Sequence, residues 1–421
     1  MKSAMKSTTV CVLSCVLFAV GVVVGCNANR RASNADGLST TRGVSSTGPS
    51  TMATSRPSRF ASLDPVWSNF DEAYAMLSTR PDWREHGPMS LPRHPAEKHL
   101  KGLVIVLDPG HGMSDGKTDP KYKRGPTGVR EDDMNLRVGM LLKRLLEEAG
   151  AVVVMTRETD ALVNFDERAG KANDYVRADG TKGADLFISL HHNAAGPTAN
   201  YSSVWYHGEV DWNGVELDVG KSIGHALGRH LRTDAARTNP LLSDQLMYKS
   251  GFGMLRQTNV PAILLESSFF SHPEEEQRLA DAVYNLREAY AIYEGLCEWA
   301  YQGRPTQSVT LAGSVVSIVL EDGLPPWWGR ERNRIETSTI SVTLGGEPVA
   351  FKKDKNTLTM DLPGKIADDA VLEVRFKNML GNSNYPTRFT QSAGQIRAIG
   401  PERAKLPATR PGDPDHGPRA D

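Results

Sequence analysis

Three of the side chains best suited to metal binding or proton transfer stand at the ends of apolar runs. His111 follows the run 103–107, His191 follows the run 185–190, and Glu266 closes a third run. Continuous apolar runs of this length are typical of strands buried on both faces of a sheet. In sheets built from such strands the chemistry lies beyond the strand ends, so we expect these side chains to lie along one edge.

A fourth candidate, Glu131, opens the helical pattern that follows the first apolar run. Two neutral imidazoles and one carboxylate around an open fourth position are typical of a catalytic zinc site. A second carboxylate nearby would then accept a proton from the bound water. Taken one at a time these signals are weak, because a histidine after a strand is more often an ordinary hydrogen-bonded loop residue.

The elements that must position these residues alternate along the segment 102–300. Apolar runs predict strands at 103–107, 151–155, 185–190, 201–206 and 261–266, and i, i+3, i+4 spacing predicts helices at 134–146, 164–176, 214–232 and 273–300. Strands separated by helices imply an α/β fold, with a mostly parallel twisted sheet and helices on both of its faces.

Between residues 305 and 395 the pattern changes to short alternating runs. These runs predict strands at 309–311, 315–320, 340–344, 358–362 and 371–376. We therefore predict a small C-terminal antiparallel β-sandwich-like domain. Aromatic and basic residues in it would form either a patch for a glycan or anionic wall polymer, or part of a core or domain interface: Trp327, Trp328, Arg330, Arg332 and Arg334.

Four sequence blocks, in this order and spacing, resemble the zinc-dependent N-acetylmuramoyl-L-alanine amidases of the type 3 family. The blocks are Leu107–Gly112, Gly128–Glu131 with Asn135 and Leu136, Ile188–Asn193, and Pro261–Ser271 followed by Pro273. Further agreement comes from Thr156-Arg157, Arg168, Ala172-Asn173 and Leu255-Arg256. The resemblance extends from about Lys101 to Ala300 and predicts an amidase catalytic domain over residues 101–302.

The resemblance implies that His111, Glu131 and His191 bind one zinc ion and that Glu266 is the catalytic carboxylate. In such a site zinc would lower the pKa of a bound water, and Glu266 would take the proton. The implied reaction is hydrolysis of the amide between N-acetylmuramic acid and L-alanine in peptidoglycan, for cell-wall remodelling or cell separation. Two other readings are a catalytically inactive peptidoglycan-binding lipoprotein and a zinc peptidase acting on a different cell-wall amide.

The chain departs from the family pattern at His192, where a small residue is usual, and at Ser267-Ser268. His192 would either touch substrate or be a bystander, and we favour the bystander because neighbouring residues of a strand point to opposite faces. Arg256 would pair with a peptide carboxylate or Glu266, or make a structural salt bridge, the role we favour. Asn193 is a further candidate for contact with substrate or with a ligand.

Some family members carry an inserted helix that blocks the zinc cleft until a partner removes it. Here the corresponding segment, 228–254, is short and contains Pro240. We therefore predict no such helix and no obligatory activator.

The N-terminus has the features of a secretory signal with a lipid anchor. Lys2 and Lys6 precede the uncharged, apolar run 7–25, and Val23–Cys26 resembles the lipobox of bacterial lipoproteins. The alternative is an uncleaved membrane helix, which the length of the run also allows. We predict cleavage of residues 1–25 and a diacylglycerol on Cys26, which places the chain in the cell envelope on the periplasmic side. The outer membrane is favoured if the cell has two membranes.

The rest of the chain is divided by composition. Residues 26–63 are rich in Ser and Thr, and we predict that they form a disordered tether. We predict an N-terminal helix and strap for residues 64–100 and a disordered tail for residues 401–421. The 49 Lys and Arg nearly balance the 50 Asp and Glu, so the net charge offers no support for nucleic-acid binding. The four cysteines, Cys11, Cys15, Cys26 and Cys297, lack the spacing of a zinc finger or a disulfide framework.

Overall fold

The computed structural model describes most of residues 93–400. It leaves out 114–116, 119–121, 209–213, 232, 235–240, 326–333, 363–369 and 393–394 within that range. The predictions for the signal segment, Cys26, the tether, the strap up to residue 92 and the tail lie outside the described residues. Of the strap, only the short 3-10 helix η3 (Glu97–Leu100) is seen among residues 93–100.

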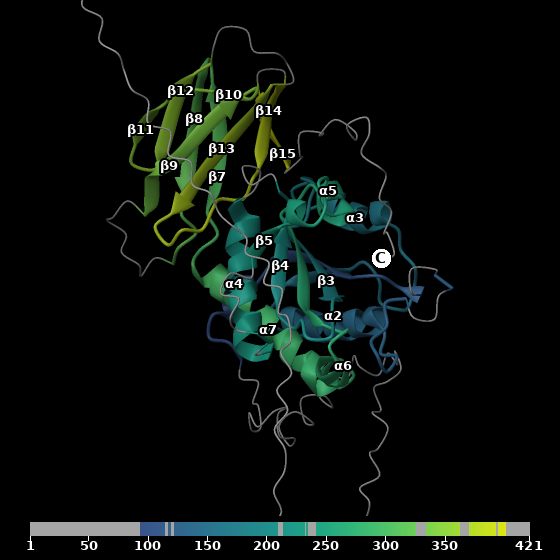
Figure 1. Cartoon of the computed structure of the whole chain (residues 1–421). Helices are drawn as coiled ribbons and strands as arrows, with labels where there is room; N and C mark the ends of the chain where they lie inside the picture. Colours follow the sequence, from purple (N-terminus) through teal and green to yellow (C-terminus); the bar gives the residue numbers. More distant parts are fainter. Residues whose placement is uncertain are drawn as a thin grey trace, which may run out of the picture. The chain divides into compact units, whose positions relative to one another are not determined.

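A six-stranded sheet in the order β2-β1-β3-β6-β4-β5 forms the centre of the α/β domain (Figure 1). Its strands are β1 (Val104–Pro109), β2 (Val152–Met155), β3 (Leu186–Asn193), β4 (Ser203–Tyr206), β5 (Leu241–Ser243) and β6 (Ala262–Phe269). β2, β1, β3 and β6 are parallel to one another, whereas β4 is antiparallel to β6 and parallel to β5. The prediction of a mostly parallel sheet is confirmed, and β5 is a strand that the sequence did not indicate.

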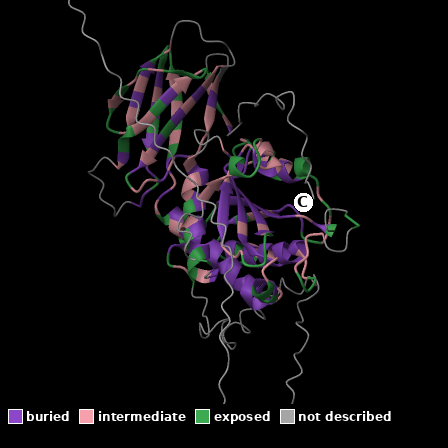
Figure 2. Cartoon of the chain, viewed as in Figure 1, coloured by how far each residue is buried: buried purple, intermediate pink, exposed green. Residues whose placement is uncertain are grey.

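Helices cover both faces of this sheet, as predicted (Figure 1). They are α2 (Glu131–Glu148), α3 (Phe165–Asn173), α4 (Gly214–Leu231), α5 (Gly253–Gln257), α6 (Pro273–Leu279) and α7 (Ala282–Tyr301), with a 3-10 turn η6 (Asp244–Leu246) before α5. Ile105 and Leu107 of β1 join the apolar cluster with α2, α4 and α7, while Val104 and Val106 join the cluster with α3 and α5. β1 is therefore buried on both faces, and Figure 2 shows the central strands of the sheet as mostly buried.

The segment 273–300 forms two helices rather than the single long helix that we predicted. α6 ends at Leu279, and Asp281 begins α7 as its N-cap, with a side-chain oxygen that accepts a hydrogen bond from the backbone N–H of Val283 at 2.9 Å. An aspartate at this position satisfies one of the free N–H groups of a helix start. The apolar spacing continues across the break, which is why periodicity alone did not reveal it.

The C-terminal region consists of two antiparallel sheets that share one apolar core, which confirms the β-sandwich-like prediction. One sheet has the order β11-β12-β8-β7 and the other β10-β9-β13-β14-β15. The strands are β7 (Thr306–Ala312), β8 (Val315–Glu321), β9 (Ile335–Leu344), β10 (Glu347–Pro348), β11 (Lys352–Asp354), β12 (Thr357–Asp361), β13 (Val371–Asn378), β14 (Arg388–Ser392) and β15 (Gln395–Gly400). β15 runs past the predicted domain end at residue 395.

Of the predicted aromatic and basic patch, only Arg334 is described, since Trp327, Trp328, Arg330 and Arg332 lie outside the described residues. Its guanidinium pairs with the carboxylate of Asp322 at 2.6 Å and donates to the carbonyl of Pro325 at 2.9 Å. Arg334 therefore binds the segment that follows β8, from Asp322 to Pro325.

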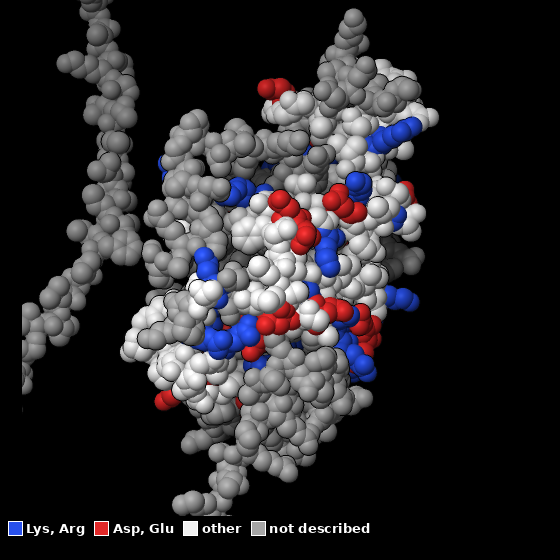
Figure 3. Space-filling view, turned by 90° about the vertical axis from the view of Figure 1, so that its right-hand side faces the viewer, with Lys and Arg blue, Asp and Glu red and all other residues white. Residues whose placement is uncertain are grey.

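Other sequence features are visible in the described part of the chain. The Cys297 thiol is buried in α7 and is not in a disulfide. Helices of residues 93–400, as far as they are described, are all too short or too polar to cross a lipid bilayer. On the face shown in Figure 3, Lys and Arg side chains are interspersed with Asp and Glu.

We expect the substitution Asp281→Ala to reduce the free energy of unfolding by about 1 kcal/mol, because the N-cap of α7 is lost. Asp281→Asn retains an oxygen that can accept from Val283 and should keep most of the stability. Urea unfolding of both variants and the parent measures the difference. An Asn variant as unstable as the Ala variant would contradict the capping role.

Candidate metal centre

The candidate residues converge because three neighbouring strands run in the same direction. In the register between β1 and β3, Pro109 lies beside Leu190, so His111 and His191 come from adjacent strand ends. His191 of β3 in turn lies beside Glu266 of β6. The structure thus confirms that the ends of these strands meet at one edge of the sheet.

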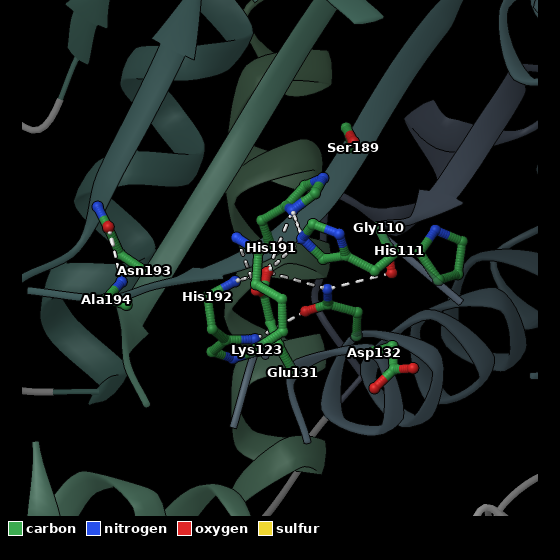
Figure 4. A network of polar contacts seen from close by, with 12 residues as sticks. Gly110, His111, Lys123, Glu131, Asp132, Ser189, His191, His192, Asn193 and Ala194 are labelled. Carbon is green, nitrogen blue, oxygen red and sulfur yellow. Dashed lines mark hydrogen bonds and ion pairs between the residues drawn. The ribbon is translucent and has the colours of Figure 1, made fainter. Parts of the chain in front are cut away.

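Three side chains bring their donor atoms together at this edge (Figure 4). His111 Nε2, His191 Nδ1 and Glu131 Oε1 form a triangle in which each side is 3.1 Å. Ligand atoms about 2.0–2.1 Å from a tetrahedral zinc ion would lie roughly 3.3 Å apart, so the triangle has the size of one face of such a site. Each of the two ring nitrogens faces two neighbours, but a ring nitrogen can donate or accept in one direction only. Hydrogen bonds alone therefore do not account for all three contacts.

The charges of Glu131 and His191 fit a cation. Burial alone would raise the pKa of Glu131, but the imidazole of His111 and the ammonium of Lys123 hold it well below its usual range. Lys123 Nζ lies 3.5 Å from Glu131 Oε2, and this oxygen is buried without a hydrogen-bond partner. Burial lowers the pKa of His191, which favours the neutral imidazole that binds metals. An ionised carboxylate and a neutral imidazole are the forms that a divalent metal requires.

Glu266 supplies the second carboxylate of the site. Burial, together with the negative charge of Glu131, raises the pKa of Glu266 to about 8. Its Oε2 is buried and has no hydrogen-bond partner. A carboxyl group that can hold a proton near neutral pH and has a vacant oxygen is suited to acid–base chemistry.

A buried ion pair beneath the site holds the loop that carries His111. Asp108 accepts hydrogen bonds from Thr156 Oγ1 at 2.7 Å, Ser189 Oγ at 2.6 Å and Arg168 Nη1 at 2.6 Å. Burial alone would raise the pKa of Asp108, but Arg168 outweighs it and the pKa is lowered. Arg168 also donates to the carbonyls of Pro109 and His111, so α3 fixes the backbone of the ligand loop.

A second buried guanidinium, that of Arg157, also binds carbonyl groups around the loop and shares that of Pro109 with Arg168. It donates to Pro109 O at 2.8 Å, Gly110 O at 2.8 Å and Asp132 O at 2.7 Å. Burial and the neighbouring charge of Arg168 lower its pKa to about 10. Arg157 connects the His111 loop to the first turn of α2, where Glu131 lies.

A cluster of three other carboxylates, from Asp132, Asp133 and Asp160, lies near the beginning of α2. Arg130 Nη2 bonds to Asp132 and lies 3.1 Å from Asp160 Oδ2, and Arg130 Nη1 lies 3.6 Å from Asp133 Oδ1. One guanidinium thus contacts all three carboxylates and offsets part of their negative charge.

The remaining sequence candidates have local partners. Arg256 Nη1 donates to the carbonyl of Ser250 at 3.0 Å, and Asn193 Oδ1 accepts from the N–H of Ala194 at 2.8 Å. The His192 ring lies on the opposite side of β3 from the His191 ring (Figure 4) and bonds to Asn135 and Glu288. Burial alone would lower the pKa of His192, but Glu288 outweighs it and the pKa is raised.

Several residues that support the site had no predicted role. Four of them appeared only as positions that agree with the family resemblance: Thr156, Arg157, Arg168 and Asn135. Nothing in the sequence indicated Glu288. Asn135 lies four residues after Glu131 in α2, a spacing that places two side chains on one helix face and could have indicated the contact. The partners of Glu288 are distant in sequence and gave no such signal.

The comparisons with known proteins concern this α/β domain. Residues 105–298 match the family model described as N-acetylmuramoyl-L-alanine amidase. The chain is 33% identical over 216 residues to the "Probable cell wall amidase LytH" of Staphylococcus saprophyticus subsp. saprophyticus, covering 51% of this chain and 64% of that protein. The protein of the same name from Staphylococcus epidermidis is 32% identical over 200 residues, covering 48% and 59%.

Among solved structures, the N-acetylmuramoyl-L-alanine amidase AmiC2 of Nostoc punctiforme is 25% identical, with a TM-score of 0.38, and the match covers 47% of this chain and 98% of that one. The chain spans 64% and 59% of the length of the two curated relatives.

We expect Gly110→Ala to disturb the triad, because a methyl group at this position would overlap the imidazole ring of His191. The backbone of Gly110 is not in the left-handed region, so the overlap is the main cost. Metal affinity, measured by competition with a chromophoric chelator, should fall by about 10- to 100-fold. Gly228→Ala in α4 has open space around it and should leave the affinity unchanged. Unchanged metal binding by Gly110→Ala would show that the ring position is not critical.

Proposed function

We propose that this chain, in which residues 105–298 form a domain of the N-acetylmuramoyl-L-alanine amidase family, hydrolyses the amide between N-acetylmuramic acid and L-alanine in peptidoglycan. The observation that carries the proposal is the triangle of His111, His191 and Glu131 donor atoms, with Glu266 beside His191 in the sheet register. A role in cell-wall remodelling or cell separation is part of the same proposal.

The metal that we propose for the triad is a single zinc ion, held by His111, His191 and Glu131. Two imidazole nitrogens and one carboxylate oxygen are a donor set that suits zinc and leaves a fourth position open. When bound, zinc supplies Lewis acidity, which activates water and polarises an amide carbonyl. The ionised Glu131 and the neutral His191 support this assignment.

Glu266 moves the proton in the proposed reaction. Its carboxylate accepts a proton from the attacking water as the carbon–oxygen bond forms, and returns it to the L-alanine nitrogen as the carbon–nitrogen bond breaks. The products are the lactyl carboxyl group of the sugar and a free amine on the stem peptide. The burial of Glu266 Oε2, which has no hydrogen-bond partner in the described structure, supports this role.

We expect Glu266→Gln to lower the rate of hydrolysis by about 10²- to 10⁴-fold, since proton transfer is lost while the shape is kept. The test incubates protein expressed without residues 1–26 with purified peptidoglycan and zinc, and mass spectrometry identifies the released fragments. The parent should release intact stem peptides with a free L-alanine amine. Binding without release by the parent would favour the inactive peptidoglycan-binding reading, and cleavage within the peptide would favour a zinc peptidase.

We further propose that Cys26 carries a lipid that holds the chain in the cell envelope, facing the periplasm, with the outer membrane favoured in a cell that has two. The charged and apolar leader and the lipobox-like Val23–Cys26 support this proposal. A diacyl anchor is sufficient for stable attachment to a membrane.

Cys26→Ser removes the thiol that would be acylated. We expect this variant to leave the detergent-soluble membrane fraction, in which the parent should remain, or to accumulate with its leader uncleaved. Cell fractionation and mass spectrometry of the N-terminus measure both results. A parent with an intact leader and no lipid would support the alternative of an uncleaved membrane helix.

A further inference from the structure

A continuous series of buried side chains leads from α7 to the candidate metal ligand Glu131. Glu288 Oε2 lies 3.0 Å from His192 Nε2, and His192 Nδ1 lies 2.8 Å from Asn135 Oδ1. Asn135 Nδ2 donates to Glu131 Oε1 at 3.4 Å and to the carbonyl of Gly110 at 3.3 Å. All four side chains are buried, with Glu288 and His192 each 1% exposed.

The acceptors at the two ends fix the direction of these hydrogen bonds. The amide nitrogen of Asn135 faces a carboxylate and a carbonyl, both of which only accept, so its Oδ1 must face His192. His192 Nδ1 therefore donates to Asn135. If the Asn135 amide were reversed, its oxygen would face Glu131 Oε1, and two acceptors would repel each other.

Glu288 secures the donor role of His192. Its carboxylate lies 3.0 Å from the second ring nitrogen, Nε2, and provides the acceptor that this nitrogen needs while Nδ1 donates to Asn135. Without Glu288, the ring would have an unpartnered nitrogen in a buried site, which carries a high free-energy cost. The backbone N–H of His192 also donates to Glu131 Oε1 at 3.2 Å, so this residue acts on the same oxygen twice.

We propose that Glu288 is a positioning residue for Glu131, acting through His192 and Asn135; the inference rests on the proposed metal-binding role of Glu131. Glu131 Oε1 is the oxygen that meets both histidine nitrogens, and two N–H donors hold it there. Groups that orient a metal ligand in this way commonly change metal affinity by about 10- to 100-fold when removed.

The competing explanation is that Glu288 and His192 merely fill the contact between α2 and α7. The same two helices provide a matched control, because Arg137 Nε of α2 donates to Asn285 Oδ1 of α7 at 2.7 Å. Asn285 is buried and precedes Glu288 by about one helical turn, but its hydrogen bonds go to Arg137 and to the carbonyl of Leu279. Asn285→Ala therefore disturbs the helix contact without removing a hydrogen bond of the series that leads to Glu131.

The experiment is a double-mutant cycle on the full chain, with Glu288→Ala, His192→Ala and both together. Zinc affinity is measured by competition with a chelator, and the stability of the metal-free protein by urea unfolding. Glu288→Ala should weaken zinc binding by about 10- to 100-fold. In the His192→Ala background, adding Glu288→Ala should change the affinity by less than about twofold, because the connection is already broken. Asn285→Ala should lower stability and leave the zinc affinity unchanged.

Different results contradict different parts of the argument. Parent-like zinc affinity in Glu288→Ala, or independent losses that multiply in the double variant, would overturn the positioning role and leave the proposed amidase function intact. Failure of the parent chain to bind zinc would overturn both. If Glu288→Ala does not fold, Glu288→Gln keeps the volume and removes the charge, and its loss of affinity should be smaller but still depend on His192.

Discussion

The candidate metal centre depends on the buried ion pair between Asp108 and Arg168. Both side chains are at most 4% exposed, so each charge would be very unfavourable without the other. Asp108 also binds hydroxyl groups that follow β2 and lie in β3, and Arg168 reaches from α3 to the backbone before His111. One charge pair thus connects the two strands that flank β1, and a helix, to the loop that carries a proposed ligand.

This support allows His111 to adopt a backbone conformation that L-residues rarely take. Its φ angle is 62°, in the left-handed region, where a residue with a side chain is strained. Strain of this kind persists only where the surroundings enforce it. Arg157 and Arg168 bind the carbonyls of Pro109, Gly110 and His111, and these fixed contacts explain how the ring is held toward Glu131.

The two glutamates of the site receive opposite electrostatic environments. Positively charged and hydrogen-bonding groups around Glu131 keep its carboxylate ionised. Burial and the negative charge of Glu131 instead disfavour the ionised form of Glu266. Carboxyl groups whose pKa values are separated in this way can serve as ligand and proton carrier in one site.

The buried imidazole of His192 needs a hydrogen-bond partner on each of its nitrogens. Asn135 of α2 and Glu288 of α7 supply these two partners.

Local sequence determined the elements and the identity of the candidate residues. The apolar runs before His111 and His191, and the run ending at Glu266, predicted three parallel strands because burial on both faces requires continuous apolar sequence. Since parallel strands end at one edge, their functional side chains could be grouped from the order of the residues alone. Short or interrupted elements escaped this reasoning: β5 has three residues, and the cap at Asp281 lies within an unbroken apolar pattern.

Only the tertiary structure decided how those residues are held. The contacts of Arg168 with Asp108 and of Glu288 with His192 join residues 60 and 96 positions apart. A hydrogen bond depends on distance and direction in space, and neither is encoded in the spacing of residues along the chain. The amino-acid sequence therefore determined which groups could bind a metal and move a proton, and the packing of α2, α3 and α7 on the sheet decided which buried partners orient them.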